Sequence, residues 1–361
     1  MPRKPFRPPS PVPVDRQKTM DKIKEWLLSL IDFDTTSEGP DAERCVRYIA
    51  GILSARGAVV HTYTTEGILR TGHHLLAEVP GERSETVLLH AHLDTADRGR
   101  EEDWLFPAGR ASLRSGCVCG RGALDCKGPL AVWMKLLSDA AGRKRRPYTL
   151  KLLVTDLEER GGAEGLGALL AGHPELLSEL KLVIGEGGGF PFPFGEDIFY
   201  TFQTGEREPG ESRQTHPAAT VAERDRILEM GIEKGFYSKE ILAYAAGADR
   251  LTGRRLDIRP LYEDMEMFFA GAAFSGVYTD HGPAFAAALR AEIPGARLMP
   301  CITPGTSDSR WFRAEGVPVV GFFPLDAANS LSGIHGSNEY ISEKSLRLAY
   351  RVLSGALDRI K

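Results

Sequence analysis

Short apolar runs alternate with helical patterns along most of this chain, and that alternation limits its possible folds more than any other feature. Apolar residues at helical spacing predict helices over residues 18–33, 41–56, 130–137, 163–170 and 342–360, with another from Ser307. Strand-like runs occupy residues 59–64, 75–79, 86–92, 149–155, 180–184, 298–302 and 317–322. We therefore expect an α/β fold with a mostly parallel, mixed sheet flanked by helices.

The alternation is lost between about residues 190 and 297. This stretch holds polar, proline-bearing segments and helical patterns only near residues 220–235 and 238–246. A chain of 361 residues exceeds one ordinary core, so two domains are expected. The expected division is a disordered, proline-rich tail (1–14), a main domain in two parts (15–195 and 298–361), and a smaller inserted α+β domain (196–297).

Composition excludes several classes of protein. The net charge is −4 and the basic residues are scattered, so no nucleic acid partner is expected. No apolar run approaches the roughly 18–20 residues that span a bilayer, and no secretory signal is evident. The five cysteines are odd in number and form no repeated CxxC frame. Reduced thiols and a cytoplasmic location are the prediction.

Residues with metal-binding chemistry follow the predicted strands. His92 and Asp94 leave the strand at 86–92 on one face, because side chains two apart in a strand point the same way. Open α/β sheets bind ligands at that edge. Four more fragments hold such residues: 120–128 (GRGALDCKG), 158–162 (EERGG), Glu186 at a strand end, and 335–339 (HGSNE). Each fragment alone is as well explained by a tight turn, a solvated helix start or an ordinary loop.

In this order and spacing, however, the five fragments form a specific set. The chain resembles the co-catalytic zinc hydrolases that include acetylornithine deacetylase, succinyl-diaminopimelate desuccinylase, aminoacylase and glutamate carboxypeptidase. The resemblance covers most of residues 18–195 and 298–361. It implies a zinc-exopeptidase-like catalytic domain and a lid or dimerisation domain in the insert, and hence a homodimer.

The resemblance also implies a metal site with two divalent cations. Asp125 would bridge them, His92 and Glu186 would complete one site, and Glu159 and His335 would complete the other. Zinc suits such a shell of histidines and carboxylates, with cobalt or manganese as alternatives. The peptide bond after Asp125 is expected to be cis, which a non-proline residue adopts only where a site demands it.

Two further acids receive catalytic roles from the resemblance. Asp94 would orient His92 from behind, and Glu158 would act as the general base that moves a proton from water to the leaving amine. The implied reaction is hydrolysis of an amide bond in an N-acyl amino acid or small peptide that carries a carboxylate. A metal-binding scaffold of the same fold that has lost its catalysis is the alternative, although such a scaffold has no need of Glu158.

The residues that bind the substrate are less well defined by the sequence. Thr306 and Arg310 lie in a loop that resembles the family's carboxylate-binding segment, but Arg310 could equally pair with a nearby helix acid. The lid of this family supplies a histidine for the oxyanion. His216 and His281 are the two candidates, and either could be an ordinary surface histidine.

Three other readings of the motifs compete with a two-metal site. His90 and His92 could form the HxH pair of a barrel-type amidohydrolase, but that fold needs roughly eight strand–helix units. The glycines at 120, 122 and 187–189 could cradle a nucleotide, yet neither a P-loop nor GxGxxG is present. Cys126 could be a nucleophile, but no activating base is evident, so a packing role is expected.

Overall fold

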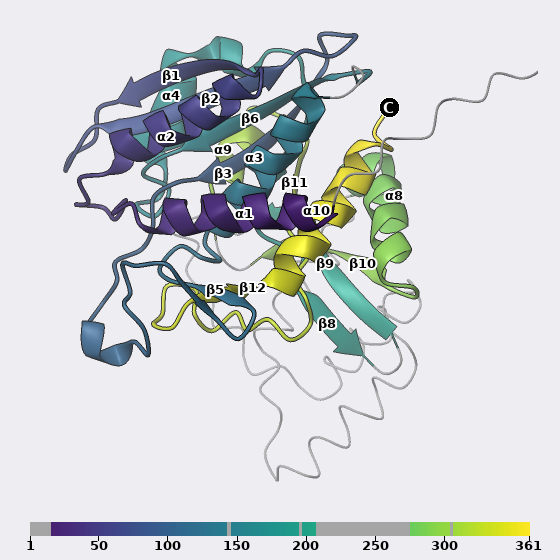
Figure 1. Cartoon of the computed structure of the whole chain (residues 1–361). Coiled ribbons are helices and arrows are strands. Elements are labelled where there is room, and N and C mark those ends of the chain that lie inside the picture. The colour runs from purple at the N-terminus through teal and green to yellow at the C-terminus, as the bar shows by residue number, and fades with distance from the viewer. Residues whose placement is uncertain (1–15, 143–145, 195–196, 207–274, 304–305) are drawn as a thin grey trace, which may run out of the picture.

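The computed structural model describes residues 16–142, 146–194, 197–206, 275–303 and 306–361 (Figure 1). Its helices are α1 (Arg16–Ile31), α2 (Ala42–Ala55), α3 (Lys127–Ala141), α4 (Ala168–Gly172), α8 (Ser275–Glu292), α9 (Ser309–Ala314) and α10 (Glu343–Leu357), with short turns η1 (Glu101–Asp103), η2 (Ala163–Gly167) and η3 (Pro174–Leu177). Its strands are β1 (Val59–Thr65), β2 (Gly72–Val79), β3 (Thr86–His92), β4 (Ser112–Arg114), β5 (Cys117–Cys119), β6 (Thr149–Thr155), β7 (Leu180–Gly185), β8 (Pro191–Phe194), β9 (Asp197–Glu206), β10 (Arg297–Thr303), β11 (Val319–Gly321) and β12 (Tyr340–Ser342). The tail at 1–14 and the helices predicted at 220–235 and 238–246 lie outside the described residues.

Nine strands form one open sheet, in the order β1-β2-β6-β3-β7-β11-β9-β10, with β8 paired to β9. The central strands β6, β3, β7 and β11 are parallel, whereas β1, β2 and β6 pair antiparallel at one side. Every residue of β3 is buried, as its apolar sequence predicts for a strand covered on both faces. The α/β prediction is confirmed, and the open strand order of the described chain excludes the barrel.

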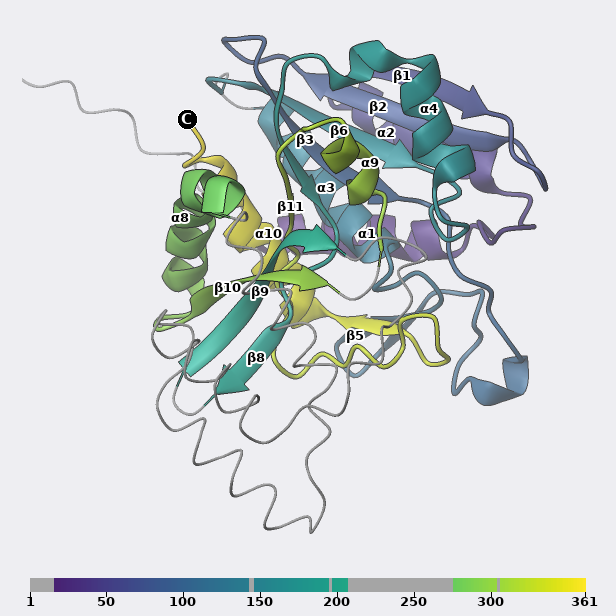
Figure 2. The ribbon, with the colours of Figure 1, turned by 180° about the vertical axis from the view of Figure 1, so that it is seen from behind.

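Helices cover both faces of this sheet (Figures 1 and 2). Helices α1, α2, α3, α8 and α10 lie on one face, over the larger buried cluster that includes Leu89 and Trp133. Helices α4 and α9 lie on the other face, over a smaller cluster that includes Leu88 and Phe312. Leu88 and Leu89 are neighbours in β3 and are both buried, because successive side chains of a strand face opposite layers.

Two elements inside the segment expected to be an insert belong to these main layers instead. Strand β9 pairs with β10 and β11 in the large sheet, and α8 packs against α10. The side chains of Phe199 and Phe202 in β9 are buried, so this strand is apolar enough for a core position. The main domain therefore extends past residue 195 to the end of β9 and begins again before residue 298. Within the expected insert, residue 196 and residues 207–274 lie outside the described chain.

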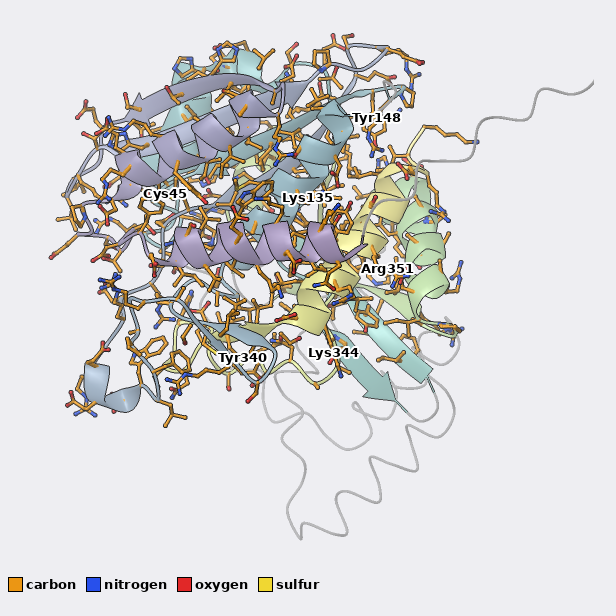
Figure 3. The ribbon with its side chains drawn as sticks, viewed as in Figure 1. Cys45, Lys135, Tyr148, Tyr340, Lys344 and Arg351 are labelled. Atoms are coloured by element: carbon orange, nitrogen blue, oxygen red, sulfur yellow. The ribbon has the colours of Figure 1, made fainter. Side chains whose placement is uncertain are left out.

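The end of the sheet away from the strands' carboxyl termini is closed by packing. Tyr148, which precedes β6, donates a hydrogen bond of 2.6 Å to the carbonyl of Leu357 at the end of α10. Figure 3 shows Tyr148 in the upper part of the molecule and Tyr340, the first residue of β12, in the lower part. Among the described helices, none is both long enough and apolar enough to cross a membrane.

Candidate metal centre

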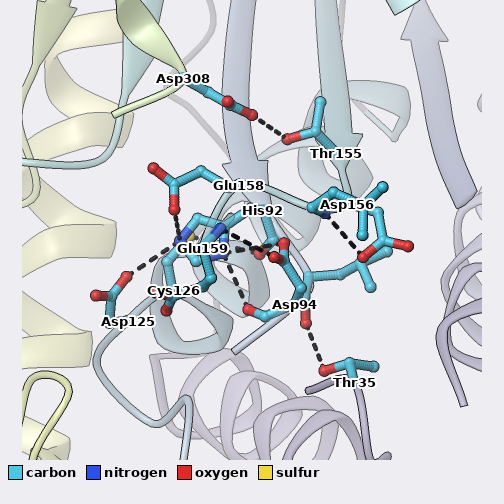
Figure 4. A network of polar contacts seen from close by, with 12 residues as sticks. Thr35, His92, Asp94, Asp125, Cys126, Thr155, Asp156, Glu158, Glu159 and Asp308 are labelled. Carbon is cyan, nitrogen blue, oxygen red and sulfur yellow. Dashed lines mark hydrogen bonds and ion pairs between the residues drawn. The ribbon is translucent and has the colours of Figure 1, made fainter. Parts of the chain in front are cut away.

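Three of the predicted site segments follow the carboxyl ends of neighbouring parallel strands. His92 is the last residue of β3, Glu158 and Glu159 follow β6, and Glu186 follows β7. Strands β6, β3 and β7 lie side by side in the sheet, so their carboxyl ends meet at one edge. Figure 4 shows His92 beside Glu158 and Glu159, which follow β6, and near Asp125 from the loop before α3.

Asp125 lies between two histidines that are far apart in the sequence. Its Oδ1 is 3.1 Å from Nε2 of His92, and its Oδ2 is 3.2 Å from Nε2 of His335. The peptide bond between Asp125 and Cys126 is cis, as expected. One carboxylate thus faces both histidines, each through a different oxygen, which is the arrangement that a bridging ligand requires.

The loop that presents Asp125 is anchored by a buried acid, Glu339. Its two oxygens accept hydrogen bonds from the backbone N–H groups of Gly122 (2.9 Å), Leu124 (2.8 Å) and Asp125 (3.0 Å). Arg121 adds a buried ion pair of 2.8 Å to the same carboxylate. This anchoring role was not predicted from the sequence, although the acid at the end of the fifth motif was its signal.

The half of the site around His92 is buried, and we call His92, Glu186 and Asp125 Oδ1 the inner half. Nε2 of His92 is 3.2 Å from Glu186 and 3.9 Å from Glu158. Its Nδ1 lies 3.0 Å from the backbone carbonyl of Asp94 and 3.5 Å from that residue's carboxylate. A carbonyl only accepts, so Nδ1 carries the proton and Nε2 is left for a cation. The main chain of Asp94 therefore orients the ring more closely than the expected carboxylate does.

The outer half consists of His335, Glu159 and Asp125 Oδ2. Nε2 of His335 is 3.0 Å from Glu159. The other oxygen of Glu159 accepts a 2.9 Å hydrogen bond from the N–H of Ala96, and its own N–H donates to Asp94 at 3.0 Å. The side chain of His335 is 60% exposed and its residue has a left-handed backbone with φ of 56°. This half is completed by an exposed loop rather than by a strand end.

Electrostatics of the cluster favour added positive charge. Burial raises the pKa of Glu158 well above its usual range, against the lowering effect of His92. Burial alone would lower the pKa of His92, but neighbouring groups including Glu186 and Asp125 raise it well above its usual value. Hydrogen bonds to Asp125 and Glu159 raise the pKa of His335 to about 10. Both shifts have the same cause: the surrounding carboxylates favour positive charge at the positions of these two histidines.

The donor atoms of this cluster fit divalent metal ions. Two sets of residues offer ligand atoms that, within each set, lie within 4.8 Å of one another. One set is His92, Asp125 and Glu159, and the other is His92, Cys126 and Glu186. Nitrogen and carboxylate donors suit zinc, and also cobalt or manganese. Carboxylates packed this closely repel one another unless a cation lies between them.

Cys126 is the one member of these sets that does not suit a metal. Its buried thiol donates to the carbonyl of His92 over 3.5 Å, and burial raises its pKa well above the usual value. A thiol must lose its proton to act as a ligand or a nucleophile, so this residue has a packing role, as predicted.

His90 belongs to a separate buried network. Its Nε2 is 3.1 Å from the hydroxyl of Thr155, which donates a 2.8 Å hydrogen bond to Asp308. Burial lowers the pKa of His90 to about 3 and raises that of Asp308 to about 7. His90 is therefore a neutral structural histidine, and the HxH interpretation of His90 and His92 is wrong.

Unlike the predicted metal ligands, the predicted substrate-binding residues are not brought together in one cluster. Thr306 is exposed in the loop before α9. Arg310 donates a hydrogen bond to the backbone carbonyl of Gly161 and lies over the ring of Trp311 at 5.0 Å. The alternative was that Arg310 pairs with a nearby helix acid. Among the described residues, no hydrogen bond joins Arg310 to such an acid.

His281, one of the two candidates for the lid histidine, does not lie at the described centre. His281 is in α8, where burial lowers its pKa and the charge of Lys181 adds to that effect. Lys181 stands near the amino end of β7, whereas Glu186 follows the carboxyl end of that strand. The structure thus places His281 toward the opposite end of the sheet. His216 lies outside the described residues.

Comparisons with known proteins show the family of this chain. Residues 88–359 match the family described as Peptidase family M20/M25/M40. A stretch of 174 residues, 48% of this chain, is 33% identical to 38% of a cysteinylglycine-S-conjugate dipeptidase of Corynebacterium striatum. Another of 205 residues, 55% of this chain, is 25% identical to 48% of a probable succinyl-diaminopimelate desuccinylase of Staphylococcus aureus. The chain thus matches less than half the length of either relative.

A solved structure extends the likeness of the fold to nearly the whole chain. The crystal structure of human carnosine dipeptidase 1 superposes with a TM-score of 0.66 over 96% of this chain and 98% of that one. The two sequences are only 14% identical, so this likeness concerns the fold alone.

Proposed function

Because the chain belongs to peptidase family M20/M25/M40, we propose that it is a metal-dependent hydrolase of amide bonds. The proposed substrate is an N-acyl amino acid or a short peptide that carries a carboxylate. The names of the matched relatives, a dipeptidase and a desuccinylase, support a substrate of this class. Because those matches cover less than half of each relative, neither name is transferred to this chain.

One observation carries the proposal: the two oxygens of Asp125 face two different histidines, His92 and His335, at 3.1 and 3.2 Å. A site for one ion needs no carboxylate that is shared in this way. Each histidine also has its own second acid, Glu186 for His92 and Glu159 for His335. The cluster therefore divides into two similar halves around one common ligand.

In the proposed site, His92, Glu186 and Asp125 hold one divalent cation, and Glu159, His335 and Asp125 hold the other. Zinc is the proposed metal, with cobalt or manganese as alternatives. When bound, such ions supply Lewis-acid polarisation of the scissile carbonyl and of a water molecule.

Glu158 is the proposed general base. Its Oε2 is 3.9 Å from Nε2 of His92, so it lies beside the inner half without taking part in its closest contacts. Burial raises its pKa, which favours a group that accepts a proton from water and then delivers it to the leaving amine. Glu158 Oε2 would hold that proton between the two transfers.

Hydrolysis of a substrate panel tests the proposal. Purified protein would be offered dipeptides and N-acyl amino acids with zinc, cobalt or manganese, and the same substrates after treatment with a chelator. We expect hydrolysis of at least one substrate class, its loss on chelation, and its return when metal is added back. A chain that binds metal but hydrolyses nothing in the panel would support the scaffold alternative instead.

Dimerisation remains a prediction that sedimentation can check separately.

A further inference from the structure

Helix α9 packs directly on the turn that carries Glu158 and Glu159. The residues of this turn, 158–162, end in two glycines with left-handed backbones, Gly161 at φ of 90° and Gly162 at φ of 65°. A side chain added at Gly162 would lie 2.0 Å from the carboxylate of Asp308 and 2.9 Å from the indole nitrogen of Trp311. The turn and the start of α9 are therefore in contact without space for even a methyl group.

Arg310, in the first turn of α9, forms the polar link across this contact. Its guanidinium donates a hydrogen bond to the carbonyl oxygen of Gly161, while its Cζ lies over the ring of Trp311, 5.0 Å from the ring centre. The N–H of Gly161 in turn donates a 2.6 Å hydrogen bond to the carbonyl of Glu158. Arg310 is thus joined to the main chain of Glu158 through a single residue.

We propose that Arg310 is a positioning residue, which fixes the turn at 158–162 so that the carboxylate of Glu158 stays beside the metal centre. This role rests on the proposed function, and it differs from the gripping of a substrate carboxylate that the sequence suggested. A guanidinium that already donates to a main-chain carbonyl and stacks on Trp311 is held in place by the protein itself. Its purpose is then to hold the turn rather than to recognise the substrate.

The two roles of Arg310 predict different kinetics for Arg310→Met. If Arg310 is a positioning residue, its loss lowers kcat, by about 100-fold if the base moves by an ångström, and leaves KM nearly unchanged. If Arg310 instead binds the substrate carboxylate, its loss raises KM. In that case, the variant would also cease to distinguish an acid substrate from the matching carboxamide. Arg310→Lys retains a charged donor and should recover part of kcat.

Hydrogen exchange of the turn supplies a readout that does not depend on activity. The amides of Gly161 and Gly162 are hydrogen-bonded within the turn, so mass spectrometry of peptides covering 155–165 reports its opening. We expect faster exchange there in Arg310→Met than in the wild type. Arg160→Met is the matched control, because Arg160 lies in the same turn but faces Glu164 at 3.9 Å. This control should exchange like the wild type.

The outcomes separate the inference from the proposed function. A fall in kcat with constant KM and faster exchange would support the inference. A rise in KM with unchanged exchange, or exchange unchanged in both Arg310→Met and Arg310→Lys, would overturn it. If the wild type hydrolyses nothing, the proposed function fails, and the exchange data still decide whether Arg310 holds the turn.

Discussion

The two halves of the metal centre differ in how the fold supports them. The inner half depends on His92 and Glu186, which end neighbouring strands at the centre of the sheet, and the His92 side chain is 1% exposed. The outer half depends on His335, which is 60% exposed in a loop. Glu159 links the two, because its N–H binds Asp94 while its carboxylate contacts His335.

We therefore expect the inner half to form together with the core, whereas the outer half depends on the contacts that hold the loop of His335 in place. The loop of His335 is held by Glu339, whose carboxylate binds the Asp125 loop, and by Asn338, which bonds to the segment before Phe106. In that contact, the side-chain oxygen of Asn338 accepts the N–H of Leu105 at 2.6 Å. Changes to the inner half should therefore affect folding and metal binding together, and changes to the outer half only metal binding.

The largest expected effect concerns the base beside the inner half. Glu158→Gln keeps the size of the side chain but cannot accept the proton from water. We expect kcat to fall by about 100- to 10,000-fold, the usual range for loss of a general base. Steady-state kinetics on the best substrate of the panel measure this fall.

Metal content serves as the control for Glu158→Gln. Because Glu158 is outside both proposed ligand sets, the variant should retain the same number of ions per chain as the wild type, by elemental analysis. A loss of metal in this variant would make Glu158 a ligand and would contradict its assignment as the base.

The next effect compares one histidine from each half. His92→Ala empties a fully buried position, so we expect the free energy of unfolding to fall by about 2–5 kcal/mol. His335→Ala removes a side chain that is 60% exposed and leaves no buried cavity, so its loss of metal-free stability, through the contacts with Asp125 and Glu159, should be smaller, about 1 kcal/mol. Denaturant unfolding of both variants without metal measures the contrast. Equal losses of stability would mean that the outer half is as much part of the core as the inner half.

The smallest effect concerns the charge behind His92. Asp94→Asn keeps the main-chain carbonyl that contacts Nδ1 of His92 and an acceptor for the N–H of Glu159, but removes a negative charge. We expect metal affinity to fall by about 10- to 100-fold, as for other supporting groups behind a ligand. Competition with a chromophoric chelator measures the affinity. An unchanged affinity would show that the carbonyl alone orients the ring.

Local patterns in the sequence predicted the strand that carries His92 well. The strand of His92 is apolar along its length and ends where the polar residues begin, so its place in a covered parallel sheet follows from the pattern. The same pattern cannot assign a strand to a partner. β9, which contains Phe199 and Phe202, was not predicted as a strand, and its pairing with β10 joins segments far apart in the chain. It was therefore assigned to the insert.

Side-chain partners were the least predictable feature. Arg310 carries a charge that suits a carboxylate, and nothing in its neighbours along the sequence points to the carbonyl of Gly161. That contact exists because α9 packs on the turn that follows β6, which is a tertiary arrangement. Glu339 is a similar case, since its partners at residues 121–125 precede it by more than half of the chain.

Crystals soaked with zinc and measured for anomalous scattering test the central claim most directly. The account predicts two anomalous peaks on either side of the Asp125 carboxylate. One would lie about 2 Å from ligand atoms of His92 and Glu186, and the other about 2 Å from Glu159 and His335. A single peak that contacts only one histidine, or zinc bound elsewhere with Asp125 free, would contradict it.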